Sequence, residues 1–146
     1  MQVEIRENAF DPWSECAAYQ RARLASGQHG ATAVFVGTMR DFNAGDTVVG
    51  MRLEHYPGMT ERSLHRLLEE AAGRWALLDA LILHRVGELL PDEPIVLVAV
   101  WSAHRREAFE ACRWLMEALK SQAPFWKKER LADGRERWVE ANTPGG

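Results

Sequence analysis

The chain has 146 residues, of which 47% are hydrophobic and 27% are charged, and its formal net charge is −3. This composition is typical of a globular protein and excludes a disordered chain, while the negative net charge argues against a protein that coats nucleic acid. The length predicts a single domain over residues 1–146. We expect no nucleic-acid partner, and any anion binding must be local.

Two further features bear on location. The first ten residues are too polar for the core of a signal peptide, and no apolar run approaches the roughly 20 residues of a membrane helix. Cys16 and Cys112 lie far apart in the sequence and form no CxxC pair. Neither a zinc ribbon nor a disulfide framework is therefore indicated. We expect a cytoplasmic protein that does not bind membranes.

The N-terminal half alternates between strand and helix patterns. β-Branched and apolar runs predict strands, an Asp-Pro pair predicts a helix start, and helical spacing of apolar residues predicts a second helix after a Pro-Gly turn. The predicted elements are a strand at residues 3–5, a helix from Asp11-Pro12 to about Ala25, a strand at 31–39 with its antiparallel return at 48–56, and a helix at 59–75.

The C-terminal half follows the same logic. Two apolar runs are joined by a Pro-Asp-Glu turn, a helical stripe follows, and an Asp-Gly pair between extended runs is a strong hairpin signal. We expect strands at 80–89 and 94–101, a helix from 103 to about 120, and a hairpin of 125–131 with 136–139. The pattern predicts an α+β fold with a largely antiparallel sheet.

A helix that ends at a proline carries the first candidate site. Lys120 lies at the helix end and Lys127 lies beyond Pro124, with the aromatic residues Phe125 and Trp126 between them. An apolar wall beside an amine disfavours its charged form, so such a lysine can be tuned for acid/base or nucleophilic chemistry. The spacing alone favours the plainer alternative, in which two solvated lysines flank a core aromatic pair.

A second candidate site lies where a strand passes into the helix at 103–120. Ser102 can cap this helix, and its free N–H groups, with His104 and Arg105, would bind an anion such as phosphate. Arginines in a first helical turn interact unfavourably with the helix dipole, so a functional role for these arginines is favoured modestly over a purely structural one. Arg40, after the strand at 31–39, gains weight only if it converges with other basic groups.

The length of this helix constrains both sites. From residue 103 to Lys120 it spans roughly 25 Å, at 1.5 Å per residue. Its two ends cannot line one pocket in a single chain. If His104 and Arg105 act with Lys120 on one small substrate, they must come from different copies of the chain, across a symmetric dimer interface. The alternative is two separate sites in each subunit.

Other signals are weak. The five histidines show no metal-binding spacing, so we predict no bound metal, and no phosphate-binding loop or nucleophile elbow is present. Cys112 lies on the apolar helix face, where its default role is a small buried hydrophobe.

Several strings carry a family likeness. They are Phe35-Val36-Gly37-Thr38-Met39-Arg40, Leu53-Glu54-His55-Tyr56-Pro57-Gly58-Met59-Thr60, His84-Arg85-Val86-Gly87-Glu88-Leu89, Ser102-Ala103-His104-Arg105 and Ala123-Pro124-Phe125-Trp126-Lys127-Lys128-Glu129. In this order they closely resemble the large, catalytic subunit of molybdopterin synthase. The resemblance spans most of the chain.

The resemblance implies an α/β-hammerhead fold with an additional small antiparallel β-subdomain. It also implies a homodimer at the centre of a heterotetramer, with a small ubiquitin-like sulfur-carrier subunit at each outer end. The implied reaction converts cyclic pyranopterin monophosphate to molybdopterin, with sulfur delivered from the carrier's C-terminal Gly-Gly thiocarboxylate. No cofactor is implied, because the sulfur arrives already activated on the partner.

The resemblance also implies site residues. Lys120 and Lys127 would be catalytic and line the pocket that receives the carrier's tail. The implied substrate-binding residues are Arg40, His104 and Arg105, with Thr38, Met39, Lys128 and Glu129 as their neighbours in the same motifs. The His-Arg pair would lie across the subunit boundary from the lysines.

Two other hypotheses remain open. In one, Cys112 carries sulfur as a persulfide, which requires an exposed thiol of low pKa. In the other, the chain is a non-catalytic docking scaffold for a ubiquitin-like protein. Two departures also stand out: Asn142 replaces a basic residue that is frequent in the family, and the chain ends Pro144-Gly145-Gly146, like the tail of the expected carrier. That ending is either a coincidental flexible terminus or a self-occluding tail.

Overall fold

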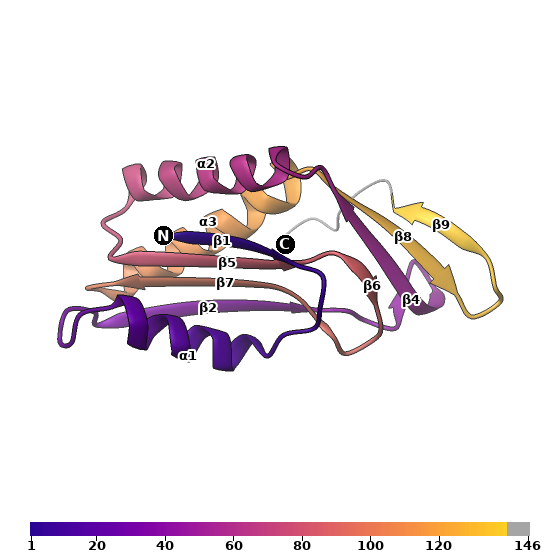
Figure 1. The fold of residues 1–146 in the computed structure, drawn as a ribbon, viewed down its shortest axis with the longest axis horizontal. Helices are drawn as coiled ribbons and strands as arrows, with labels where there is room; N and C mark the ends of the chain where they lie inside the picture. Colours follow the sequence, from indigo (N-terminus) through magenta and orange to yellow (C-terminus); the bar gives the residue numbers. More distant parts are fainter. Residues whose placement is uncertain (140–146) are drawn as a thin grey trace.

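The computed structural model describes residues 1–139, which form three helices and nine strands (Figure 1). The strands are β1 (Gln2–Arg6), β2 (Ala31–Thr38), β3 (Phe42–Asn43), β4 (Asp46–His55), β5 (Asp79–Arg85), β6 (Gly87–Leu89), β7 (Pro94–Ser102), β8 (Phe125–Leu131) and β9 (Glu136–Val139). The helices are α1 (Pro12–Arg23), α2 (Met59–Arg74) and α3 (Arg105–Gln122).

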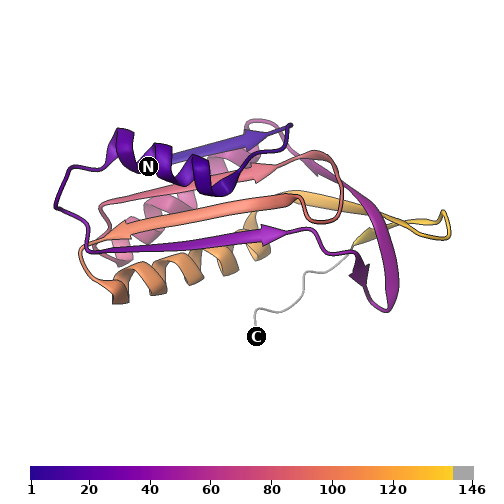
Figure 2. The ribbon, with the colours of Figure 1, turned by 90° about the horizontal axis from the view of Figure 1, so that it is seen from below.

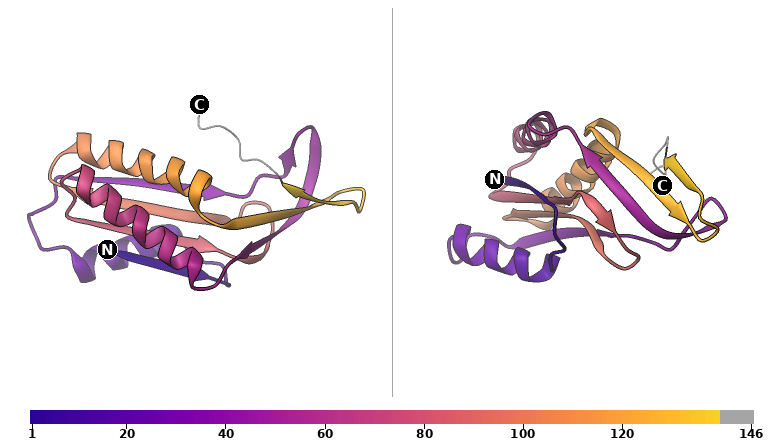
Figure 3. Two further views of the ribbon diagram at one scale, coloured as in Figure 1. Left: turned by 90° about the horizontal axis from the view of Figure 1, so that it is seen from above. Right: turned by 45° about the vertical axis from the view of Figure 1, so that its right-hand side comes forward.

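The first sheet has the order β1-β5-β7-β2, in which only the β1–β5 pair is parallel. Helices α2 and α3 cover one face and α1 lies on the other (Figures 2 and 3). Because both faces are covered, the central strands contain continuous apolar runs, at 80–83 in β5 and at 94–101 in β7, and both strands are almost entirely buried.

Helix α1 begins where the sequence predicts. The Asp11 carboxylate accepts a hydrogen bond of 3.0 Å from the Trp13 N–H, and Pro12 occupies the first turn. Tyr19 fixes the helix to the sheet, because its ring stacks on Trp101 at 5.4 Å and its hydroxyl donates a 2.8 Å hydrogen bond to Asp79.

Helices α2 and α3 pack with the first sheet through their apolar stripes. Leu64, Leu68 and Leu115 are fully or almost fully buried, and they pack with the β5 and β7 side chains that face the helices. Helix α3 runs along the sheet, so its start and its end lie at opposite ends of the sheet (Figure 3).

A second, antiparallel sheet extends from one end of the first (Figure 3). It has the order β3-β4-β8-β9, with β6 also paired to β4. Its small core contains Met39, Val48, Met51, Leu53 and Leu131, among other residues. The predicted β8–β9 hairpin around Asp133-Gly134 is confirmed, with Gly134 at φ +89°. The predicted α+β class and largely antiparallel pairing are also confirmed.

One strand prediction was wrong in its pairing. Residues 48–56 were expected to return along the strand at 31–39, but β4 pairs with β3, β6 and β8, while β2 pairs with β7. The reason is local: Ala44 and Gly45, at φ 50° and 83°, reverse the chain within a short β3–β4 hairpin before it can return along β2.

The strand expected at 80–89 is two strands. β5 ends at Arg85, and Gly87, at φ 86°, turns the chain so that β6 joins the second sheet. Within residues 1–139, no helix is long and apolar enough to cross a membrane.

Candidate functional site

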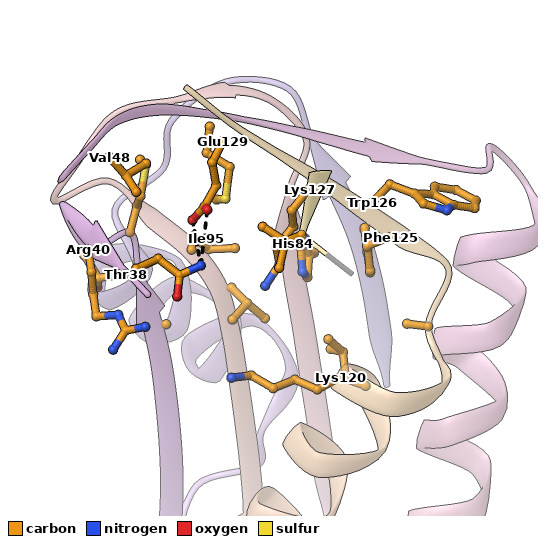
Figure 4. A pocket seen from close by; sticks show the side chains of 18 of the residues that line it. Thr38, Arg40, Val48, His84, Ile95, Lys120, Phe125, Trp126, Lys127 and Glu129 are labelled. Carbon is orange, nitrogen blue, oxygen red and sulfur yellow. Dashed lines mark hydrogen bonds between the residues drawn. The ribbon is translucent and has the colours of Figure 1, made fainter. Parts of the chain in front are cut away.

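A pocket of about 860 Å³ lies where the two sheets meet the C-terminal end of α3 (Figure 4). Its walls come from the end of β2 and the residues after it, from β4 and β8, and from the last turns of α3. Of the predicted site residues, Thr38, Met39, Arg40, Lys120, Lys127 and Glu129 line it.

The two lysines reach the pocket from either side of the helix end. Helix α3 ends at Gln122, and Pro124 cannot continue it, so β8 begins at once with Phe125. Lys120 is exposed in the last helical turn, and Lys127 is half-buried on β8. Figure 4 shows both side chains directed into the pocket. The break between helix and strand therefore brings together residues that are seven positions apart.

The surroundings of Lys127 make its charged form less favourable than it is in water. Burial lowers the pKa of Lys127 below its ordinary value, and the positive charges of Lys120 and Arg40 lower it further, whereas the Glu129 carboxylate opposes the shift. Of the two alternatives that the sequence left open, partial desolvation holds at Lys127, whereas Lys120 is exposed, as the plainer alternative expects.

Arg40 adds a third cation to the pocket. Its guanidinium carbon lies 4.8 Å from the centre of the Phe42 ring, a cation–π contact that orients the side chain. Thr38 and Met39 precede it at the end of β2 and line the pocket, and Met39 is almost fully buried in the small core of the second sheet. Arg40, Lys120 and Lys127 give the pocket a positive field suited to an anionic ligand.

Glu129 braces the wall of the pocket. Its buried carboxylate accepts hydrogen bonds from Asn43 Nδ2, at 3.1 and 3.2 Å, and from Arg137 Nε at 3.0 Å. Arg137 also donates to Asp46 and to the Asn43 carbonyl, both at 2.8 Å. This network ties the β3–β4 hairpin to β8 and β9, and so steadies the segment next to Arg40. Sequence reasoning missed both Asn43 and Arg137. The Asn43 contact depends on strand order, whereas Arg137 lies opposite Glu129 in the predicted β8–β9 hairpin and could have been found from its register.

Lys128 does not line this pocket. Consecutive side chains of a strand point to opposite faces, so Lys128 lies on the other side of β8 from Lys127. There it forms a 2.8 Å ion pair with Glu136 and lies 5.5 Å from the centre of the Trp138 ring. The structure therefore does not bring Lys128 together with the other predicted substrate-binding residues.

His104 and Arg105 lie at the far end of the first sheet. His104 is the cap residue of α3 and Arg105 its first residue, and both are exposed. Fifteen residues separate Arg105 from Lys120, which is roughly 22 Å of helix. Neither His104 nor Arg105 lines the pocket of its own chain. The expectation that the two helix ends cannot line one pocket is confirmed for the single chain.

A histidine that the sequence analysis did not single out also lines the pocket. His84, near the end of β5, is almost fully buried and lines the pocket next to Phe125 and Lys127 (Figure 4). Burial lowers the pKa of His84 to about 4, and the charges of Lys127 and His55 also lower it, so the imidazole is neutral near pH 7. The sequence offered only a histidine at the end of an apolar strand.

This buried histidine predicts loss of stability in acid. Its pKa is about 4 in the folded chain against an ordinary 6.5, so below pH 6.5 the unfolded chain takes up a proton that the folded chain does not. The stabilisation is complete above pH 6.5 and is lost as the pH falls toward 4. We expect the free energy of unfolding to fall by up to roughly 3 kcal/mol over this window.

Urea unfolding at a series of pH values measures this effect. His84→Phe, which cannot take up a proton, should flatten the dependence between pH 6.5 and 4. Parallel curves for the wild type and this variant would show that His84 does not cause the loss.

The two cysteines lie in apolar surroundings. Cys112 is buried in the core between α3 and the first sheet, and burial raises the pKa of its thiol to about 11. Burial also raises the pKa of Cys16, which is half-buried. Neither thiol has the lowered pKa that a reactive cysteine requires.

Residues 1–139 contain no group of three or more His, Cys, Asp or Glu side chains arranged to hold a metal ion. That the protein works without a metal stays a prediction. Asn142 and the Gly145-Gly146 ending lie outside the described residues.

Comparisons with known proteins agree on one family. Residues 5–122 match the model of the MoaE protein family. A protein of Ralstonia nicotianae named molybdopterin synthase catalytic subunit is 53% identical over 139 residues, which cover 95% of this chain and 77% of that protein. One of the same name from Pseudomonas aeruginosa is 51% identical over 140 residues, covering 96% and 91%.

Solved structures give the same answer. A molybdopterin biosynthesis MoaE protein from Burkholderia ambifaria is 46% identical, with a TM-score of 0.80 over 97% of this chain and 90% of that one. A molybdopterin synthase structure from Staphylococcus aureus is 31% identical, with a TM-score of 0.82 over 93% and 95%. The family model, the similar sequences and the similar structures thus lead to the same conclusion: the chain belongs to the MoaE protein family.

Proposed function

We propose that this chain is the catalytic subunit of a molybdopterin synthase and acts in molybdenum cofactor biosynthesis. It transfers sulfur from the C-terminal thiocarboxylate of a small ubiquitin-like carrier to cyclic pyranopterin monophosphate, which forms the dithiolene of molybdopterin. The observation that carries the proposal is the convergence of Lys120, Lys127 and Arg40 on one pocket. Relatives about half identical in sequence are named for this activity.

The chemistry of the pocket fits an anionic acyl donor. A thiocarboxylate carries negative charge. Once its sulfur has bonded to the pterin side chain, water attacks the carbonyl carbon of the resulting thioester, negative charge develops on the carbonyl oxygen, and the carbon–sulfur bond breaks to release the carrier as a carboxylate. The ammonium of Lys127, in a partly desolvated setting, would hold the thiocarboxylate and stabilise that developing charge. Lys120, exposed at the helix end, would supply and remove protons as sulfur attacks the pterin side chain and oxygen departs.

The size of the pocket and the access to it also suit two reactants, the carrier tail and the pterin substrate. The volume of about 860 Å³ lies near the upper end of the range of roughly 300–1,000 Å³ that is usual for small-molecule pockets. An extended carrier tail could enter beside the exposed aromatic side chains of Trp126 and Phe42, which lie at the rim. No cofactor is required, because the sulfur arrives on the carrier.

The family resemblance assigns the substrate's phosphate to Arg40, His104 and Arg105, and one chain does not bring these three residues together. Arg40 is present there, but His104 and Arg105 lie roughly 22 Å away along α3. We therefore place two copies of the chain side by side in a homodimer, so that the His104–Arg105 pair of one copy completes the site of the other. A carrier subunit bound at each outer end makes a heterotetramer, which would work in the cytoplasm.

Reconstitution tests the activity itself. The purified chain, a thiocarboxylated carrier and cyclic pyranopterin monophosphate are mixed, and dithiolene formation is followed. Product should appear only when all three are present, and two carriers should be consumed per pterin. Absence of product with a correctly folded chain would favour the remaining alternative, a non-catalytic docking scaffold for the carrier. That scaffold would bind the carrier equally well with or without its terminal sulfur.

A persulfide route would require a reactive cysteine, so replacing Cys16 and Cys112 tests it. Because both thiols are shielded and have raised pKa values, we expect the Cys16→Ser/Cys112→Ser double variant to keep the wild-type rate of dithiolene formation. The serine at position 112 is buried, so thermal unfolding of the variant is compared first. A rate lower by tenfold or more in a folded variant would restore the persulfide hypothesis.

A further inference from the structure

A polar side chain interrupts the apolar face of β5. Ala80 and Ile82 face α2 and α3 and are completely buried in the core, and His84 is the next residue on the same face. Only 4% of His84 is exposed. Burying a polar ring lowers stability unless its nitrogens find partners, so a histidine at this position calls for an explanation that packing alone does not give.

Two contacts fix the ring of His84. It stacks on Phe125, with ring centres 3.8 Å apart and planes inclined by 13°. Its Nδ1 lies 2.8 Å from the Arg85 carbonyl oxygen. A carbonyl oxygen only accepts, so Nδ1 carries the hydrogen and the neutral ring keeps an unprotonated Nε2 that can accept a hydrogen bond.

The stack joins the two sheets beside Lys127. His84 belongs to β5 of the first sheet, whereas Phe125 opens β8 of the second. Phe125 and Lys127 are two residues apart, so they lie on the same face of β8. Figure 4 shows His84 beside Lys127, with both side chains at the pocket. The charges that act on His84 come from Lys127 on β8 and His55 on β4.

We propose that His84 is a positioning residue for Lys127: Phe125 and the Arg85 carbonyl hold the ring, and its Nε2 offers the Lys127 ammonium a neutral acceptor. The consequence for sulfur transfer rests on the proposed function. A carboxylate in this place would pair with the Lys127 ammonium and so compete with the carrier's thiocarboxylate. A protonated imidazole would repel the Lys127 ammonium. A neutral acceptor orients the amine without neutralising its charge.

The small number of lysines allows the pKa of Lys127 to be measured directly by NMR. The chain contains three lysines, Lys120, Lys127 and Lys128, against fifteen arginines. Lysine-selective isotope labelling therefore gives three side-chain signals in the NMR spectrum, which single Lys→Arg variants assign. Titration of the chain alone reports the pKa of Lys127 without any sulfur-transfer reaction. Lys128, on the opposite face of β8, is the internal reference.

Two substitutions distinguish the effect of Nε2 from the effect of the ring stack. His84→Phe keeps an aromatic ring against Phe125 but removes Nε2, so the titration midpoint of Lys127 should fall by roughly half a pH unit or more, since the ammonium loses an acceptor. His84→Gln loses the stack but keeps a polar acceptor, so the midpoint should stay near that of the wild type. The kcat for dithiolene formation should fall about tenfold in the Phe variant and recover in the Gln variant.

A merely structural role predicts the reverse order. Stability should then govern both readouts, so the Gln variant would lose more activity than the Phe variant, and the Lys127 midpoint would not change in the Phe variant. Either result would overturn the proposal. His65→Gln, on the exposed surface of α2, is the control that should change neither quantity.

The two proposals can fail separately. If wild-type protein forms no dithiolene but Lys127 responds to His84→Phe as expected, the positioning role stands and the proposed function falls. If dithiolene forms and the Lys127 midpoint does not respond, the function stands and the positioning role falls.

Discussion

Replacing Lys120 by alanine is expected to lower the rate of dithiolene formation by about 10²–10⁴-fold, the usual contribution of a general acid/base group. The amine of Lys120 reaches the pocket from the last turn of α3, where the proposed reaction would take place. The side chain is exposed, so its removal should leave the fold intact apart from a small loss at the helix end, below about 1 kcal/mol.

The matched control for this prediction is Lys128→Ala. Lys128 is the neighbour of Lys127 on β8 but lies outside the pocket and pairs with Glu136 on the other face. Its removal should change the rate less than about threefold, the scale of an exposed ion pair. Equal loss of activity in the two variants would mean that general positive charge, and not an amine at a defined place, supports the reaction.

Lys127→Ala should lower kcat by about 10²–10³-fold, the effect of removing one group that stabilises developing negative charge. Because burial and the charges of Lys120 and Arg40 lower its pKa, Lys127 loses its proton at a lower pH than an exposed lysine does. The ammonium is the useful form, so the rate should fall as the pH rises through this lowered pKa.

Lys127→Arg separates charge from geometry. A guanidinium stays protonated throughout the alkaline range, so the fall in rate that Lys127 causes should move to higher pH even though the maximal rate is lower. A pH–rate profile of the wild type and this variant, recorded with saturating carrier, makes the comparison. An unchanged alkaline limb would assign that titration to another group.

The local elements were largely predictable from the sequence, because each depends on neighbouring residues. Asp11 and Pro12 start α1, Pro124 ends α3, and Asp133-Gly134 forms the β8–β9 turn. Strand partners were less predictable. Whether β4 returns along β2 or crosses to β8 depends on a reversal at Ala44 and Gly45 that alternation of apolar residues does not report.

In the site, too, local geometry was predictable from the sequence and contacts between distant strands were not. Helix geometry alone separated Lys120 from the His104–Arg105 pair, and the structure confirms that separation. Pairing between strands distant in the chain lay beyond the sequence. The pocket wall depends on Glu129 accepting hydrogen bonds from Arg137, its partner in the predicted hairpin, and from Asn43, which is distant in the chain.

The role of His84 in the site could not be predicted from the sequence, because it depends on the stack with Phe125 of β8. Lys128, a neighbour in sequence, is excluded by the alternation of β8.

The central claim is that Lys120 of one copy and the His104–Arg105 pair of another build one active site. Mixing two inactive variants tests it most directly. Lys120→Ala and His104→Ala/Arg105→Ala chains are co-expressed with different affinity tags, and the hybrid dimer is isolated through both tags.

In a shared site, one of the two sites of the hybrid receives both changes and the other receives neither. The hybrid should therefore form dithiolene at about half the wild-type rate, while each parent dimer stays inactive. A hybrid as inactive as its parents would contradict the account and place the two groups in separate sites.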